Sequence, residues 1–168
     1  GSLIAYNEES EVFNCSSVGD ERSCDGITDI KGFYKVGGLI GVNTSSLVGI
    51  TPNLLIHKNY SSCNVGRPQS GDGPMKNIFF GGLIGYNECT ALYAADKFII
   101  GENFATGNVE GGDYVGGFIG ESRGFDIIDC YSSGDVKGGN YVGGFISKVV
   151  SCDVKRSYSA GKVSSANN

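Results

Sequence analysis

The chain has 168 residues, long enough for one domain with its own hydrophobic core. Its formal charge is −5 and no basic cluster stands out, so nucleic-acid binding and electrostatic attachment to a membrane are disfavoured. Hydrophobic residues make up 40%, too large a share for a disordered chain. The 28 glycines are about twice the typical share and lack the three-residue period of collagen.

Two short patterns alternate along the chain. The opening Ser2–Asn7 resembles Gly82–Asn87, which indicates that the chain starts inside a repeat. The first pattern places two glycines between a large apolar residue and two further apolar residues, and it occurs at 36–41, 80–85, 115–120 and 142–147. The second pattern joins an aromatic residue through small residues to a valine, and it occurs at 59–65, 103–109, 130–136 and 157–163, with a weaker copy at 14–19.

The spacing of the two patterns sets the repeat length. The first pattern advances by 44, 35 and 27 residues, and the second advances by 44, 27 and 27. The basic period is therefore 27 residues, and the longer steps indicate insertions concentrated in the N-terminal half. We expect these insertions near 20–33, 42–58, 66–77 and 86–102.

A 27-residue period with two strand patterns is about one coil of a solenoid. A single coil cannot bury its own apolar side, whereas stacked coils share a continuous core. Glycine, asparagine, aspartate and serine between the patterns are turn formers. The sequence therefore predicts an all-β fold, a parallel β-solenoid of about five short rungs. We expect residues 1–168 to form a single repeat domain that is a fragment of a longer solenoid, with neighbouring repeats of the parent protein against it.

The repeats resemble the GLUG-motif repeats of bacterial surface proteins. The resemblance is carried by Gly82–Gly85 and by the run from Asn103 to Gly117, and it covers most of the chain, best from about residue 78 onward. It implies a large secreted or wall-attached bacterial protein, a class that includes adhesin-like proteins and immunoglobulin A-cleaving metallopeptidases. In those peptidases the repeats lie outside the catalytic domain, and no HExxH motif is present in this chain.

Six cysteines are scattered along the chain without a CxxC pair: Cys15, Cys24, Cys63, Cys89, Cys130 and Cys152. An even count with this spacing suits disulfides formed in an oxidising compartment, with the pairing left open among 15 combinations. Six unrelated buried thiols are the alternative. A structural zinc site is disfavoured, because such sites use closely spaced ligands and His57 is the only histidine.

No catalytic constellation is visible, so we expect that the chain is not an enzyme and uses no cofactor. The acidic residues do not recur in pairs at one repeat position, the glycine clusters lack the lysine of a phosphate-binding loop, and no GxSxG motif occurs. The longest apolar runs are only a few residues, so we expect no membrane insertion.

One row of aromatic residues is a candidate contact surface. Tyr60, Phe104, Tyr131 and Tyr158 occupy the same repeat position, so they should stack into a ladder. If the strand is unbroken, the polar residues four positions later point to the same side and the ladder faces solvent. If the glycines at 107, 134 and 161 break the strand, the ladder points into the core, and we favour this second interpretation.

These observations favour a non-catalytic extracellular or cell-surface module of an adhesin. It would bind an extracellular protein or glycan, or act as a stalk, with the insertions at 42–58, 66–77 and 86–102 as contact sites. The alternative is an accessory repeat region of a secreted peptidase or glycan-active enzyme.

Overall fold

The protein is described by a computed structural model in which residues 1–19, 30–32, 34–46, 54–66, 79–90 and 98–165 are placed. Within these ranges the structure contains 24 β-strands, all in parallel sheets. The prediction of an all-β parallel solenoid is confirmed. No helix in the described part of the chain is long and apolar enough to cross a membrane.

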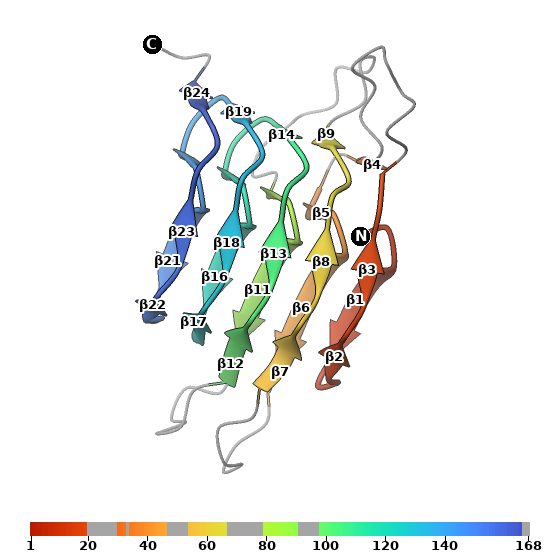
Figure 1. Ribbon diagram of the computed structural model, residues 1–168. Helices are drawn as coiled ribbons and strands as arrows, with labels where there is room; N and C mark the ends of the chain where they lie inside the picture. The colour runs from red at the N-terminus through yellow and green to blue at the C-terminus, as the bar shows by residue number, and fades with distance from the viewer. Residues whose placement is uncertain (20–29, 33, 47–53, 67–78, 91–97, 166–168) are drawn as a thin grey trace.

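Five coils stack along one axis, from the red N-terminal coil to the blue C-terminal coil (Figure 1). Each complete coil contributes one strand to each of five sheets, which we number in the order in which a coil meets them. Sheet 1 consists of β5 (Val36–Gly37), β10 (Phe80–Gly81), β15 (Val115–Gly116) and β20 (Val142–Gly143). Sheet 2 consists of β1 (Ile4–Glu8), β6 (Ile40–Ser45), β11 (Ile84–Cys89), β16 (Ile119–Arg123) and β21 (Ile146–Val150).

The other three sheets complete each turn. Sheet 3 consists of β2 (Val12–Phe13), β7 (Leu54–His57), β12 (Phe98–Gly101), β17 (Phe125–Ile128) and β22 (Val154–Lys155). Sheet 4 consists of β3 (Ser16–Ser17), β8 (Tyr60–Ser61), β13 (Phe104–Ala105), β18 (Tyr131–Ser132) and β23 (Tyr158–Ser159). Sheet 5 consists of β4 (Ile30–Lys31), β9 (Val65–Gly66), β14 (Val109–Glu110), β19 (Val136–Gly138) and β24 (Val163–Ser165).

The strand register follows the sequence period. Phe104 pairs with Tyr131, and Tyr131 pairs with Tyr158, each 27 residues further along the chain. Phe80 pairs with Val115 across the longer step of 35 residues. The repeats read from the sequence are therefore the coils of the solenoid.

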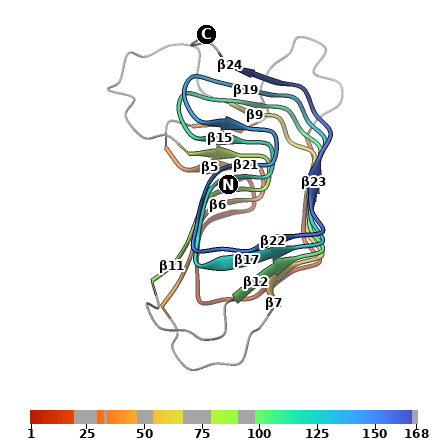
Figure 2. The same cartoon turned by 90° about the vertical axis from the view of Figure 1, so that its left-hand side faces the viewer.

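The coil encloses two separate cores, and Figure 2 shows its outline along the stack. Sheets 1 and 5 lie over one another and bury a core of Val36, Val65, Phe80, Val109, Val115 and Val136. Sheets 2, 3 and 4 surround a larger core that includes Leu39, Ile56, Ile100, Phe118, Phe125 and Ile127. Isoleucine recurs on successive coils here, because one inward repeat position provides the same space in every turn.

The paired glycines make the turn from sheet 1 into sheet 2. A Cβ on Gly117 would collide with the carbonyl oxygen of Gly144 in the next coil, and it would lie 3.1 Å from the hydroxyl of Ser132 in sheet 4. The second glycine of each pair therefore lets the chain fold back against sheet 4. No larger residue fits this close approach of backbones.

The structure corrects two details of the sequence analysis. Each coil contains five strands, whereas the sequence suggested two strand patterns. The expected insertions at 42–58 and 86–102 include residues of β6, β7, β11 and β12, which belong to the regular coil. Of these two ranges, residues 47–53 and 91–97 lie outside the described part of the chain, as do residues 20–29, 33 and 67–77 of the other two insertions.

Candidate functional site: an aromatic ladder beside a polar groove

The four aromatic residues predicted to align do form a ladder, on sheet 4. The ring centroids of Tyr60 and Phe104 lie 4.5 Å apart, those of Phe104 and Tyr131 lie 5.0 Å apart, and those of Tyr131 and Tyr158 lie 5.3 Å apart. The first three residues are half-buried and Tyr158 is 58% exposed. The ladder therefore faces outward, and the favoured prediction that it points into the core is wrong.

The inward side of sheet 4 explains this orientation. Ser61, Ala105 and Ser132 are fully buried at the positions next to the aromatic rings. They pack against the glycine pairs, where little space remains, and the Ser132 hydroxyl donates a hydrogen bond of 2.8 Å to the Gly144 carbonyl. Because side chains alternate along a strand, the aromatic residue beside each small residue must point outward. The strand does end before Gly107, as the favoured interpretation expected, but Phe104 lies before this break and keeps its outward direction.

Stacking determines which part of each ring is available to a ligand. The planes of Phe104 and Tyr131 differ by 6°, and those of Tyr131 and Tyr158 differ by 7°. Parallel rings at this distance cover one another's faces, so the outer surface presents ring edges and tyrosine hydroxyls. Burial and the neighbouring Tyr158 raise the pKa of Tyr131, which keeps its hydroxyl protonated as a donor.

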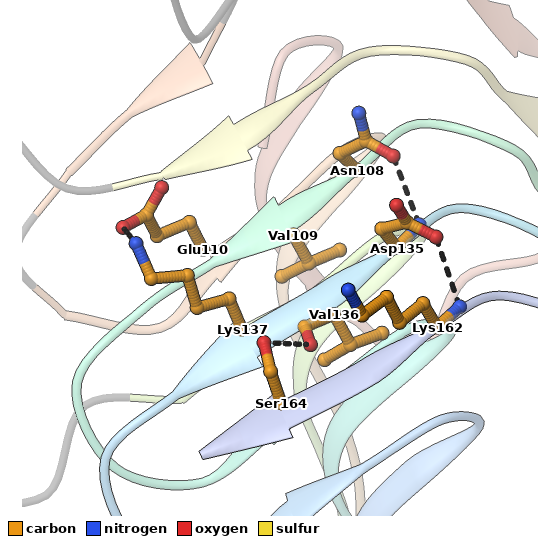
Figure 3. Close-up of a pocket in the computed structure, with 8 residues that line it drawn as sticks. All are labelled: Asn108, Val109, Glu110, Asp135, Val136, Lys137, Lys162 and Ser164. Atoms are coloured by element: carbon orange, nitrogen blue, oxygen red, sulfur yellow. Dashed lines mark hydrogen bonds and ion pairs between the residues drawn. The ribbon is translucent and has the colours of Figure 1, made fainter. Parts of the chain in front are cut away.

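A row of polar side chains follows the ladder at the corner between sheets 4 and 5. Each side-chain oxygen accepts a hydrogen bond from the backbone N–H of the equivalent residue in the next coil. Asn64 accepts from Asn108, Asn108 accepts from Asp135, and Asp135 accepts from Lys162, each at 2.9 Å. These bonds hold the corner in register, and they orient the row along its outer surface (Figure 3).

The outer surface of sheet 5 is hollowed into a groove of about 270 Å³. It is lined by Asn108, Val109, Glu110, Asp135, Val136, Lys137, Lys162 and Ser164. Lys137 forms an ion pair of 2.8 Å with Glu110 on one side (Figure 3). The lining therefore combines two carboxylates, two ammonium groups, an amide and a hydroxyl, which suits a polar ligand with several hydrogen-bonding groups.

A second charged cluster, on the outer side of sheet 2, was not found by the sequence analysis. Glu121 is 1% exposed, and its carboxylate pairs with Arg123 and, at 3.4 Å, with Lys148. Burial and the hydrogen bond to Glu88 raise the pKa of nearby Tyr86 to about 12. Glu121 pairs in register with Tyr86 on one neighbouring coil and with Lys148 on the other, and the two patterns that define the repeat do not include these positions.

The cysteines contribute no disulfide within the described residues. Cys15, Cys63, Cys89, Cys130 and Cys152 are free thiols, and Cys24 lies outside the described part. The disulfide prediction is therefore not confirmed. Adjacent coils lie about 4.8 Å apart, and a disulfide needs a similar Cα separation. Cys15 and Cys130 share one repeat position but lie three coils apart, which explains why these two do not pair.

His57 lies in strand β7, although the sequence placed it in a surface insertion. Its ring stacks on Phe13 with centroids 5.5 Å apart, and its Nε2 lies 2.7 Å from a carboxylate oxygen of Glu11. Among the described residues, no group of three or more histidine, cysteine, aspartate or glutamate side chains is arranged to hold a metal ion.

A family model of the GLUG motif matches residues 111–137. This segment runs through β15, β16, β17 and β18 into β19, which is one complete coil. GLUG repeats occur in secreted and surface proteins, and the motif is a repeat unit and not a catalytic domain. Comparisons with curated proteins and with solved structures give no match. Residues 111–137 are therefore a GLUG repeat, folded as one turn of a parallel β-solenoid.

Proposed function

We propose that this chain is a non-catalytic extracellular recognition module of a surface adhesin, and that it binds glycans through the groove of sheet 5 and the adjoining edge of the aromatic ladder. The observation that carries the proposal is the groove's dense set of donors and acceptors beside a rigid ladder. The solenoid supports this surface with hydrogen bonds in every coil, so little conformational entropy is lost when a ligand binds.

The chemistry of the groove favours a glycan over a protein partner. A typical protein interface has an apolar centre with aromatic anchors seated in pockets. The lining of this groove carries four charged groups, one amide and one hydroxyl, and its aromatic neighbours present ring edges and hydroxyls. Such a lining can satisfy the many hydroxyl groups of a sugar chain.

The test is binding of the purified chain to an array of glycans and extracellular-matrix proteins. Lys162→Ala removes an ammonium group from the groove, and Lys155→Ala removes one from sheet 3 as the matched control. Glycan binding that is lost in the first variant and kept in the second supports the proposal. Binding to matrix proteins alone overturns the glycan assignment, and binding to neither class points to a spacer role.

A further inference from the structure

Tyr131 and Tyr158 bring two phenol rings together on neighbouring coils. The two residues are register partners in sheet 4, and their ring planes differ by 7° with centroids 5.3 Å apart. The Tyr158 N–H donates to the Cys130 carbonyl at 3.2 Å, and the backbone holds the register here. The Ala160 N–H donates to the Ser132 carbonyl at 3.0 Å on the other side of the rings. The two rings are therefore kept face to face by the stacking of the coils.

A second stacked pair of tyrosines differs in its charged surroundings. The rings of Tyr114 and Tyr141 lie with centroids 4.8 Å apart and planes 9° apart. The ammonium group of Lys148 lies 5.5 Å from the centroid of the Tyr114 ring. A cation at this distance attracts the electrons of the ring, so Tyr114 is harder to oxidise. Within the described residues no ammonium or guanidinium group lies over the ring of Tyr131 or Tyr158, so this pair loses electrons more easily.

Two phenol rings that lie face to face are arranged for radical coupling. Removing one hydrogen atom from each hydroxyl leaves two phenoxyl radicals, and each unpaired electron is shared with the ring carbons next to the C–O bond. The orbitals that hold this electron point perpendicular to the ring plane, toward the other ring of the pair. A bond between one such Cε carbon of each ring pairs the two electrons. Each coupled carbon then loses its hydrogen as a proton and each ring oxygen takes up a proton, which restores both phenols.

We propose that Tyr131 and Tyr158 form a dityrosine cross-link when a haem peroxidase and hydrogen peroxide oxidise the chain. The pair gives up two hydrogen atoms, and one molecule of hydrogen peroxide takes them up and becomes two molecules of water. Because both rings are already in place, a link within the chain is favoured over links between molecules. The link joins residues 27 positions apart on adjacent coils, and it restricts the unfolded chain as a disulfide does.

The experiment measures the intact mass of the chain after oxidation. The purified chain is treated at low concentration with a haem peroxidase and hydrogen peroxide, and is then reduced with a thiol reagent. The reduction restores the hydrogens of any disulfide, so a remaining loss of two hydrogen atoms indicates dityrosine. Peptide mapping then identifies the joined residues. We expect a link between Tyr131 and Tyr158 that forms several-fold faster than any link at Tyr114.

Two conservative variants test whether stacking selects the partner of Tyr131. Tyr158→Phe keeps the ring and removes its hydroxyl, so we expect the link at Tyr131 to disappear. Adding Phe104→Tyr to this variant provides a phenol on the other neighbouring coil, where the ring centroid lies 5.0 Å from that of Tyr131 and the planes differ by 6°. We expect the link to return, now between residues 104 and 131. Circular dichroism of each variant confirms that it is folded.

Coupling of N-acetyltyrosine in a parallel reaction shows that the oxidant is active. An unchanged mass of the chain under those conditions overturns the proposal. Links found only between Tyr114 and Tyr141, or only between separate molecules, also overturn it. A double variant that does not recover the link at Tyr131 overturns the argument from stacking, because its new phenol lies beside that ring.

Discussion

The side-chain oxygen of Asn103 accepts a hydrogen bond of 2.9 Å from the backbone N–H of Asn59 in the preceding coil. The Asn103 amide donates in turn to the carbonyls of Ile56 and Gly101, at 2.8 and 2.7 Å. Asn103 is fully buried, so these bonds satisfy backbone groups that water does not reach. One side chain therefore links two coils where sheet 3 turns into sheet 4.

Replacing Asn103 with alanine should leave these buried groups without partners, and we expect the free energy of unfolding to fall by about 3 kcal/mol. Chemical denaturation measures this free energy of unfolding. The matched control is Asn108→Ala, because Asn108 accepts the same kind of bond from Asp135 at an exposed corner. Water can replace that bond, so we expect a loss of about 1 kcal/mol or less. Equal losses in the two variants would contradict this account.

Replacing Gly117 with alanine tests the turn from sheet 1 into sheet 2. A Cβ at this position would collide with the carbonyl oxygen of Gly144, so the two coils would have to separate locally. We expect the free energy of unfolding to fall by about 3 kcal/mol. Ser133→Ala, on the exposed outer surface of the same coil, should change it by less than about 0.5 kcal/mol. A Gly117→Ala variant with the same free energy of unfolding as the unmodified chain would show that packing does not require glycine at this position.

The sequence predicted the period, the parallel stack and the membership of the aromatic ladder, because identical repeat positions must align when coils stack. It did not reveal sheet 3 as a separate layer. The isoleucines at 56, 100 and 127 share a register position, but two of them lie in ranges whose spacing suggested insertions. The outward direction of the ladder could not be predicted either. It depends on Ser132 meeting the glycine pair of another sheet, which only the closed coil shows.

Replacing Glu121 with glutamine tests the buried charge on sheet 2. The carboxylate holds Arg123 and Lys148 together, and removing its charge leaves two half-exposed cations side by side. We expect a loss of about 2 kcal/mol in the free energy of unfolding. Glu110→Gln breaks the pair with Lys137, which is exposed on both sides, and should cost less than about 1 kcal/mol. A Glu121→Gln variant as stable as the unmodified chain would show that the cluster stabilises nothing.

The thiol of Cys130 should respond to alkaline pH. Burial raises its pKa to about 11 from an ordinary value of 9.0, so the folded protein favours the protonated thiol. The stability that this adds is fully present below pH 9, and it is lost as pH rises through about 11, because the unfolded chain releases the proton first. The Cys130→Ala variant lacks this contribution.

The measurement is the free energy of unfolding against pH for the unmodified chain and for Cys130→Ala. We expect the difference between the two to shrink between pH 9 and pH 11. The control is Cys152→Ala, which removes a half-buried thiol from the last coil. In the folded chain an alkylating reagent should label Cys130 far more slowly than the half-buried Cys15, because only the thiolate reacts and Cys130 is 1% exposed. Labelling of Cys130 as fast as Cys15 would mean that this corner opens readily, in conflict with the hydrogen bonds that Asn103 makes there.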